Sequence, residues 1–509
     1  MKKDNSISVD SKIDWIRQQL GNGSDLSIQR MRLHEGLSNV LIAIIFFSSL
    51  VDKAKIREMS LEINKLSNSI KGIGNKTEIY FEMLQNTPLC GSNVTTGSND
   101  EEIIQQILEG HTVIIFDGIE PFLCYNTYGP EGRAIEEPTS QTVIRGPKEG
   151  FTEKIENNIS QIRRRIKDQS LRIEPLKLGT ITKTNVTLLY IDGIAQESNI
   201  NEVKKRIGKI QIDGIFESGN IEELIKDDPY SLFPTIYNTE RPDTVSSALL
   251  EGKIAIFVDG SPYSLIAPTT FMEFFISSED HYHSPFASAL FRLVRLLSLF
   301  LTVLVPGVYI ALTTFDQELI PTPLLLNIAA QREGVPLPAF WEAIIMEITF
   351  EILREAGIRM PRAIGPAISI VGALVLGQAA VQAGFVSAAM VIVVSITAIA
   401  SFCIPSTSMA DALRIIRFIF MLLAAFMGLY GIFICIIGLT LHLCKLKSLG
   451  VPYMAPFAPV LSKKNQDAIF RAPLWSIKQY PSLISKAKTE RCSMNGPTQK
   501  GQTHTPERK

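Results

Sequence analysis

The residues best placed to do chemistry are four glutamates on one predicted apolar helix. Glu347, Glu351 and Glu355 follow one another at intervals of four, so they share one face of that helix. Arg354 lies on the same face, and Glu342 precedes the row on the same segment. A carboxylate in an apolar helix is costly in lipid unless it lines something, pairs or rests at an interface. The chemistry that such a row offers is the attraction of cations.

Two interpretations of this acidic stripe stay open. As an interfacial helix it would lie on the membrane or pack against another subunit, although interfacial helices usually carry a basic polar face. As a pore or vestibule helix, several copies around an axis would form rings of carboxylates, which favour cations.

The other chemically reactive residues form no motif. The six cysteines contain no CxxC pair, and the six histidines have no Cys, Ser or acid partner at a catalytic or metal-ligand spacing. A formal net charge of -1 gives no general case for nucleic-acid binding. We therefore expect no enzymatic activity, no cofactor and no metal site.

The segment after the acidic stripe has a small residue at every fourth position. These residues are Gly365, Ser369, Ala373 and Gly377. Such a face predicts close packing between helices. An earlier apolar segment contains the adjacent residues Pro306 and Gly307, which predict a kink.

Four segments are long and apolar enough to cross a bilayer. They are residues 290–315, 363–384, 385–404 and 415–444. Arg292 and Arg295 begin the first of them and are expected to snorkel toward the cytoplasmic side. Lysines after the last span, and an N-terminus without a signal peptide, predict that both termini are cytoplasmic. A fifth membrane helix over residues 340–356 would change this topology, and that choice stays open.

The region before the spans alternates short β-type runs with polar helical stretches, which predicts α/β structure. The motif Leu-Glu-Gly at 108–110 recurs at 250–252, and Asp-Gly at 117–118 recurs at 259–260. Both offsets are 142 residues (252 − 110 and 260 − 118). This recurrence indicates two related subdomains in tandem. Chance recurrence of a common turn pair is the alternative.

Between the two repeats, a Gly/Pro-rich loop leads into a helix that carries Arg163, Arg164 and Arg165. We expect a solvated connector with a charged face; an anion site or a docking helix between subunits is the other option. The predicted fold is thus two tandem α/β soluble subdomains followed by an α-helical transmembrane domain, with about four spans plus the amphipathic acidic helix. Its predicted parts are a helical arm (1–24), subdomain 1 (25–150), subdomain 2 (151–284), the membrane domain (285–447) and a cytoplasmic tail (448–509) that is disordered at its end.

Three stretches resemble the A subunits of the Ger-type (GerA/GerK-like) nutrient germinant receptors of endospore-forming bacteria. They are the membrane run that begins VPGVYIALTTFDQELIPTP at residue 305, RGPKEGFTE at 145 and GVPYMAPFAP at 450. The membrane run is the most specific of the three, and the resemblance covers about residues 16 to 485. The chain departs from the family in the turn FFSSLVD at 46, where a YIDGLVD-like turn is usual; YIDGIA at 190 keeps the pattern.

The resemblance implies a multi-pass receptor subunit in the spore inner membrane, with its soluble domain and tail in the spore core. It implies two partners, a transporter-like B subunit and a lipoprotein C subunit, and a response to small nutrients that ends in ion release. It also implies a homo-oligomer in the lipid bilayer that forms a cation path, which favours the pore interpretation of the acidic stripe. A secondary transporter or permease, or a non-conducting scaffold, are the alternatives; a transporter usually has more spans and an inverted repeat.

Overall fold

The computed structural model describes residues 8–21, 23–35, 38–67, 76–87, 89, 94–129, 137–138, 140–360, 377–460, 470–473 and 483–485. The chain divides into two compact units. The first unit comprises residues 1–226, 236–268 and 478–493, and the second comprises 227–235, 269–477 and 494–509.

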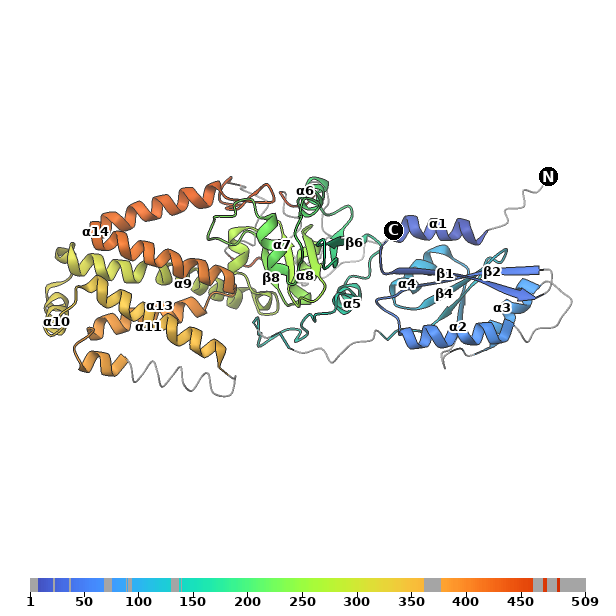
Figure 1. Cartoon of the computed structure of the whole chain (residues 1–509), viewed down its shortest axis with the longest axis horizontal. Helices are drawn as coiled ribbons and strands as arrows, with labels where there is room; N and C mark the ends of the chain where they lie inside the picture. The colour runs from blue at the N-terminus through green and yellow to red at the C-terminus, as the bar shows by residue number, and fades with distance from the viewer. Residues whose placement is uncertain are drawn as a thin grey trace, which may run out of the picture. The chain divides into compact units, whose positions relative to one another are not determined.

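The first unit contains two subdomains with the same order of helices and strands along the chain (Figure 1). Subdomain 1 consists of α1 (Val9–Leu20), β1 (Leu26–Glu35), β2 (Ser38–Phe47), α2 (Lys53–Ser67), α3 (Lys76–Asn86), β3 (Val94–Gly97), α4 (Asp100–Leu108), β4 (Thr112–Phe116) and β5 (Phe122–Tyr125). Subdomain 2 consists of α5 (Ile155–Arg165), β6 (Leu171–Leu178), β7 (Thr184–Ile191), α6 (Glu197–Ile207), α7 (Ser218–Ile225), β8 (Tyr237–Thr239), α8 (Pro242–Leu250), β9 (Ile254–Val258) and β10 (Ser264–Ala267).

The two sheets also share one topology. Their strand orders are β1-β2-β4-β5-β3 and β6-β7-β9-β10-β8, and the neighbouring strands pair antiparallel. Even the register repeats, because Ile42 pairs with Phe116 in one sheet and Val186 with Val258 in the other. The sequence repeat therefore corresponds to a repeat of strands, helices and pairing.

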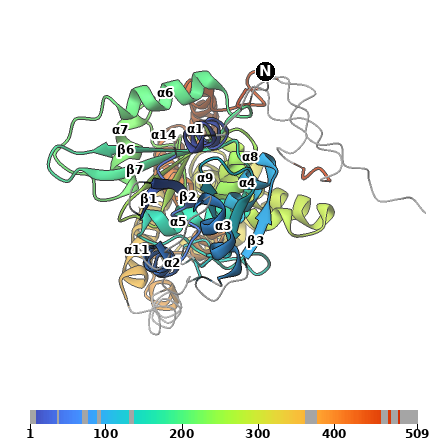
Figure 2. The same cartoon turned by 90° about the vertical axis from the view of Figure 1, so that its right-hand side faces the viewer.

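In subdomain 1, helices cover both faces of the sheet. Apolar residues of α1 and α4 pack on one face, and those of α2 and α3 pack on the other (Figures 1 and 2). The predicted alternation of strands and helices is present, and Asp52, just before α2, accepts a hydrogen bond from Ala54 N (2.8 Å). The prediction of a separate N-terminal arm is wrong, because Val9, Ile13 and Ile16 are fully buried against this sheet.

Helix α5 occupies the corresponding place in subdomain 2, where its isoleucines pack with α8 against the sheet. The prediction of a solvated connector is therefore wrong for this helix. Arg163, on α5, is 1% exposed. Its Nε donates to Asp25 Oδ2 of subdomain 1 at 3.0 Å, and its guanidinium carbon lies 4.3 Å from the centre of the Phe47 ring.

The repeated Asp-Gly pairs have the same role in both subdomains. Asp117 Oδ1 accepts a hydrogen bond from Val9 N, the first residue of α1, at 3.0 Å. Asp259 Oδ1 accepts one from Ile155 N, the first residue of α5, at 3.4 Å. A carboxylate is favourable at a helix N-terminus, where backbone N–H groups lack helical partners. The recurrence in sequence thus preserves a specific contact.

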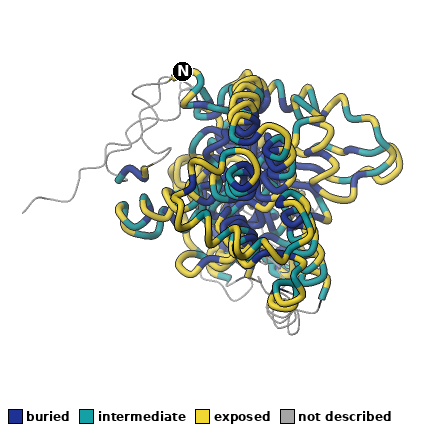
Figure 3. Tube along the Cα trace, turned by 90° about the vertical axis from the view of Figure 1, so that its left-hand side faces the viewer, coloured by how far each residue is buried: buried dark blue, intermediate teal, exposed yellow. Residues whose placement is uncertain are grey.

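The second unit is mainly helical. Among its described residues, the helices are α9 (Pro285–Thr314), α10 (Thr322–Arg332), α11 (Ala339–Arg359), α13 (Ala388–Phe402) and α14 (Thr407–Lys445). The same part contains short 3₁₀ turns (Phe271–Phe275, Ser278–His281 and Gln317–Leu319) and the strand pair β11 (Lys447–Ser448) and β12 (Val451–Pro452). Of the helices in the described part of the chain, α9 and α14 are long and apolar enough to cross a membrane. Figure 3 views this helical end and shows buried residues inside and exposed ones on the outer faces.

The predicted spans are only partly reproduced. The first span lies within α9, and the span at 385–404 corresponds to α13, which has 15 residues. Most of the predicted span 363–384 lies outside the described residues. Arg292 and Arg295 do not snorkel as predicted. Both bind the buried carboxylate of Asp280, at 3.3 and 2.6 Å, and so fix the start of α9.

The last predicted span, 415–444, is divided by the structure. Gly428 has φ 58° and ψ −144° inside α14, so the helix consists of two arms (Figure 1). A Cβ on Gly431 would lie 2.3 Å from the carbonyl oxygen of Leu423. Eight residues of straight helix would separate these positions by about 12 Å. The two arms therefore fold back on each other at Gly428.

Candidate functional site

The first part of helix α11 turns its carboxylates inward, and large apolar side chains of the helix face outward. Glu342 and Glu347 are fully buried. Large apolar residues, between 44% and 66% exposed, form the opposite face: Trp341, Ile345, Ile348, Ile352 and Ile358. A surface helix of a water-soluble protein has the reverse arrangement. This helix is suited to apolar surroundings on its outer side.

Glu342 connects the start of α11 to other helices of the unit. Its Oε2 accepts hydrogen bonds from the backbone N (3.1 Å) and the hydroxyl (2.9 Å) of Ser387, the N-cap of α13. Arg332, at the end of α10, donates to its Oε1 at 3.3 Å. The Ser387 hydroxyl lies 3.3 Å from the hydroxyl of Tyr309 on α9. Glu342 is therefore satisfied within the chain and holds α10, α11 and α13 together.

Glu347 faces the first arm of α14. Its Oε2 lies 2.7 Å from Nη2 of Arg417, which is 1% exposed. Thr397, on α13, donates to its Oε1 at 3.4 Å. The Arg417–Glu347 contact is short but is not aligned as a hydrogen bond, so its attraction is mainly coulombic. Such a pair must offset the loss of hydration of two ions.

Glu351 extends this contact into a network. Its Oε2 accepts a hydrogen bond from Arg354 Nε at 2.8 Å. Its Oε1 lies 3.5 Å from Arg417 Nη2 and 4.0 Å from Arg414 Nε. Asp411 accepts a hydrogen bond from Arg414 at 2.5 Å and lies 3.9 Å from Arg354 Nη1. Helices α11 and α14 are thus joined by alternating charges.

We call this set of six side chains the α11–α14 network. It contains three carboxylates and three guanidinium groups: Glu347, Glu351, Asp411, Arg354, Arg414 and Arg417. Its formal charge is therefore zero (3 − 3). As arranged here, the predicted acidic stripe presents no row of free carboxylates, because each acid in the network has an arginine nearby.

The arginines of α14 were missed in the sequence analysis, as were Arg332, Ser387 and Thr397. One signal could have found Arg414 and Arg417. They lie in otherwise membrane-type sequence, where a charged side chain almost always has a partner. Glutamates on a nearby apolar helix are natural partners for them.

Glu355 lies outside the network. It pairs with Arg359 one turn along α11, at 2.7 Å, and the two side chains are 53% and 78% exposed. The predicted stripe thus has two parts: buried acids held by other helices, and one exposed acid held locally.

The residues predicted for helix packing and for a kink have mixed outcomes. Gly365, Ser369 and Ala373 lie outside the described residues, and a Cβ on Gly377 would make an ordinary 3.7 Å contact with Val391 of α13. Helix α9 continues through Pro306, and the kink there stays a prediction. Gly307 permits close packing, since a Cβ there would lie 3.4 Å from the Phe420 carbonyl oxygen on α14.

The break at Gly428 is supported by Asp316, which follows α9. Asp316 Oδ2 accepts a hydrogen bond from Leu429 N at 2.9 Å and thereby caps the second arm of α14. A Cβ on Gly428 would lie 2.6 Å from this same oxygen, and the positive φ already disfavours a side chain. The two-armed form of α14 therefore depends on glycine at 428.

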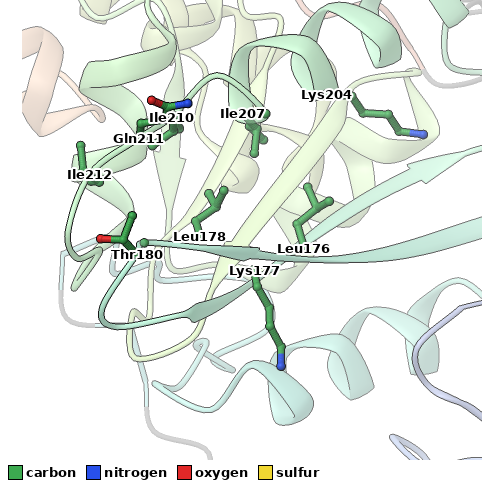
Figure 4. A pocket seen from close by; sticks show the side chains of 11 residues that line it. Leu176, Lys177, Leu178, Thr180, Lys204, Ile207, Ile210, Gln211 and Ile212 are labelled. Carbon is green, nitrogen blue, oxygen red and sulfur yellow. The ribbon is translucent and has the colours of Figure 1, made fainter.

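A pocket of about 420 Å³ lies between the end of β6 and the end of α6 in subdomain 2 (Figure 4). Leu176, Leu178 and Ile207 supply much of its apolar lining. Lys204, at its edge, is already paired with Glu174 at 2.6 Å. With mainly apolar side chains and no carboxylate in its lining, the pocket shows no convergent polar group to fix a ligand.

Comparison with known proteins gives matches along nearly the whole chain. The family model of the Bacillus/Clostridium GerA spore germination protein matches residues 14–483. Spore germination protein KA of Bacillus subtilis (strain 168) is 47% identical over 482 residues, which cover 94% of this chain and 87% of that protein. The uncharacterized membrane protein YfkQ of the same strain is 42% identical over 468 residues, 92% of this chain and 90% of that protein.

A solved structure is also similar. It is the N-terminal domain of the A subunit of the Bacillus megaterium spore germinant receptor GerK3, at 36% sequence identity. The alignment covers 52% of this chain and 96% of that chain, with a TM-score of 0.40.

Proposed function

The chain belongs to the GerA family of spore germination proteins, and from this premise we propose that it is the A subunit of a nutrient germinant receptor. The carrying observation is the family match over residues 14–483 together with 47% identity to a spore germination protein. Members of this family are receptor subunits, so the chain is not an enzyme. In our proposal it acts in the spore inner membrane with a B subunit and a lipoprotein C subunit, and it couples nutrient sensing to ion release.

The proposal includes a membrane-crossing role for α11. The helix has 21 residues, so it is about 31 Å long, close to the thickness of the hydrocarbon core. Its large exposed side chains are mainly apolar, and Glu342 and Glu347 are buried and paired within the bundle, as intramembrane charges are in known proteins; the exposed charges Glu355 and Arg359 lie at its C-terminal end. These features favour a membrane helix over a helix that lies on the surface.

Cysteine labelling tests this topology in the full chain. With the six native cysteines replaced by serine, Glu333→Cys and Met360→Cys place one thiol before and one after α11. If α11 crosses the bilayer, a membrane-impermeant maleimide labels the two from opposite sides. Labelling of both from the same side would contradict the crossing. With α11 crossing the bilayer, the α/β unit and the tail stay on one side if α14, which folds back at Gly428, crosses twice; the same assay on both parts tests our placement of the two in the spore core.

We place the cation path of an oligomer along the inward face of α11. Glu347 and Glu351 supply carboxylates there, which would favour cations. In the arrangement described above, Arg417 lies 2.7 Å from Glu347 and 3.5 Å from Glu351, and Arg354 also binds Glu351, so this state opposes cation entry. Movement of Arg417 away from one acid would free a carboxylate. The observation that supports this role is the sharing of one arginine between two acids.

Conductance of the purified oligomer in liposomes tests the function directly. Cation-selective conductance supports the proposal, whether it is spontaneous or requires the B and C subunits and nutrient. Saturable uptake of a substrate without conductance would support a transporter. If the complete receptor shows neither activity yet spores that lack the chain fail to germinate, the chain is a scaffold.

The glutamates are tested separately with Glu347→Gln and Glu351→Gln. Each substitution keeps the shape and removes the charge, and we expect a loss of cation over anion selectivity. Glu355→Gln is the matched control, because Glu355 is exposed and locally paired. Unchanged flux and selectivity in both test variants would exclude the acidic-path hypothesis and leave the receptor assignment intact.

A further inference from the structure

The two subdomains differ in how they close the turn that follows their second strand. In subdomain 1 the turn after β2 contains Leu50 and Val51. Val51 forms an isolated antiparallel bridge with Tyr128, which follows β5 in the same subdomain. Two backbone hydrogen bonds flank this bridge: Asp52 N donates to Thr127 O (2.9 Å), and Gly129 N donates to Leu50 O (3.2 Å). Subdomain 1 therefore closes this turn with its own next segment.

Subdomain 2 cannot close the turn in this way, because the chain leaves it after β10. Residues 269–477, which follow β10 in the chain, belong to the helical unit. The corresponding turn follows β7 and has the same backbone contacts: Ala195 N donates to Ile191 O, as Val51 N donates to Phe47 O. Its antiparallel bridge is made instead by Ser485, near the end of the chain.

Ser485 takes the place that Tyr128 holds in subdomain 1. The bridged residues Val51 and Ala195 are 144 positions apart (195 − 51), close to the repeat offset. The repeated glycines agree: a Cβ on Gly110 would lie 2.8 Å from the Tyr128 ring, and a Cβ on Gly252 would lie 3.1 Å from Ser485 Cβ. The backbone bridge and the close approach to Gly252 thus both place Ser485 at the position in subdomain 2 that Tyr128 holds in subdomain 1.

The contact is buried. Ala195 is 1% exposed, Ile484 is 4% exposed and Ser485 is 2% exposed. Glycine at 252 lets the tail come close to the backbone, because a Cβ there would lie 3.1 Å from both Ser485 Cβ and the Ile194 carbonyl oxygen. Addition of an extended segment to exposed backbone is a known mode of peptide recognition, with main-chain pairing for affinity and a buried side chain for specificity.

We propose that the groove between Ala195 and Gly252 is a peptide-binding slot, and that residues Leu483–Ser485 of the same chain's C-terminal tail occupy it as a detachable strap. The strap completes subdomain 2 as Tyr128 completes subdomain 1. The strap follows the helical unit in the chain but belongs to the same compact unit as subdomain 2. This binding site is separate from the α11–α14 network.

Disulfide cross-linking of the full chain in detergent tests the contact. Residues across an antiparallel bridge have Cα atoms about 4.5–5.5 Å apart, within the range for a disulfide. In the cysteine-free background, Ala195→Cys with Ser485→Cys should oxidise within one chain, as efficiently as Val51→Cys with Tyr128→Cys. Ala195→Cys with Lys500→Cys is the matched control. A yield no higher than this control overturns the proposal. Disulfide-linked dimers overturn it in favour of a tail supplied by a second copy.

Hydrogen exchange provides a measurement that does not depend on oxidation. A chain that ends at residue 482 lacks the strap, whereas a chain that ends at 487 keeps it. In the shorter chain we expect amides of the β7 turn (191–196) to exchange about tenfold faster, while those of the β2 turn (47–52) keep their rates. Ile484→Asp in the full chain should have the same effect, since it places a carboxylate at a buried position. Equal rates at 191–196 in the two truncated chains would overturn the proposal.

Discussion

Two of the buried arginines, Arg163 in the first unit and Arg417 in the second, are bound in different ways. Arg163 has a single carboxylate partner, Asp25, and meets it with two aligned contacts of 3.0 and 3.5 Å. Arg417 lies between two carboxylates, Glu347 at 2.7 Å and Glu351 at 3.5 Å, and is not aligned as a hydrogen-bond donor to Glu347. The first is a fixed pair, and the second is a shared cation.

The surroundings explain this difference. Asp25 also accepts a hydrogen bond from Ser49 at 3.3 Å, and the Arg163 guanidinium lies over the Phe47 ring. These contacts fix the orientation of the Arg163 guanidinium and join α5 of subdomain 2 to subdomain 1. Arg417 has a second acid within reach, so its guanidinium can change partner without leaving a charged site. A buried pair suits a joint between folded parts, while a shared arginine suits a site that changes state.

The largest effect that we expect follows from Arg417→Leu. The substitution leaves Glu347 buried without its cation, and breaking a buried pair in this way costs about 3–5 kcal/mol. We expect a large loss of folded protein in detergent, measured by gel filtration and by the thermal unfolding midpoint.

The double variant Glu347→Leu/Arg417→Leu is the control for Arg417→Leu. Replacing both ions with apolar groups is often neutral, so the double variant should recover most of the lost stability. It then separates structure from function: a folded but non-conducting double variant assigns the charges to ion flux. A single variant as stable as the parent chain would contradict the shared-cation description.

Asp25→Ala tests the fixed pair and should cost somewhat less, about 3 kcal/mol, because Arg163 keeps its contact with the Phe47 ring. The repeat provides a matched control. Asp192, in the β7 turn, is 54% exposed and lies 3.5 Å from Arg172, so Asp192→Ala should cost less than about 1 kcal/mol. The midpoint of the first unfolding transition of the full chain measures the loss of stability in both variants. Equal losses in the two variants would remove the distinction between a buried joint and a surface pair.

The two turns also differ in sequence beside this pair. Subdomain 2 has Asp192-Gly193 where subdomain 1 has Ser48-Ser49. Subdomain 1 has no acid at these two turn positions; its nearby acid is Asp25, just before β1, which accepts a hydrogen bond from the Ser49 hydroxyl. An acid in the turn itself would lie near Asp25 and compete for Arg163. The difference between the two turns thus lies at the joint between the subdomains.

Much of the α/β unit could be predicted from the sequence, because strands, turns and the repeat are local patterns. The burial of α1 and of Arg163 could not, since it depends on distant partners. Asp25 and Arg163 are 138 residues apart, and no spacing rule relates them. A run of three arginines is usually solvated, and only the tertiary structure shows that one of them is buried.

The sequence predicted one side of the candidate site, on α11, but not the other, on α14. The spacing of Glu347 and Glu351 identified the shared face of α11 correctly. It could not identify what that face meets, because the partners lie on α14, at positions 414 and 417. The fold-back at Gly428 was also missed, since a glycine within an apolar run is ordinary in membrane helices and the cap that supports the break comes from Asp316, which is distant in sequence.

A smaller loss of stability is expected at the repeated Asp-Gly pairs, and it tests whether the two subdomains are equivalent at these positions. Asp117→Ala and Asp259→Ala each remove a carboxylate from the start of a helix, at α1 and α5. Loss of a helix cap of this kind costs about 1 kcal/mol. We expect similar decreases in the unfolding midpoint, with Asp117→Ala slightly larger because its contact is shorter. A large effect at one position alone would show that the repeated Asp-Gly pairs have diverged.

The smallest effect belongs to the exposed end of the acidic stripe, and it shows which part of the stripe matters. Glu355 and Arg359 form a local pair with both side chains more than half exposed. Such pairs contribute less than about 0.5 kcal/mol because water screens them and ordering the side chains has an entropic cost. Arg359→Ala and Glu355→Gln should therefore leave the unfolding midpoint and ion selectivity unchanged. A change in selectivity from Glu355→Gln would move the functional carboxylate from the shared arginine to the exposed end of α11.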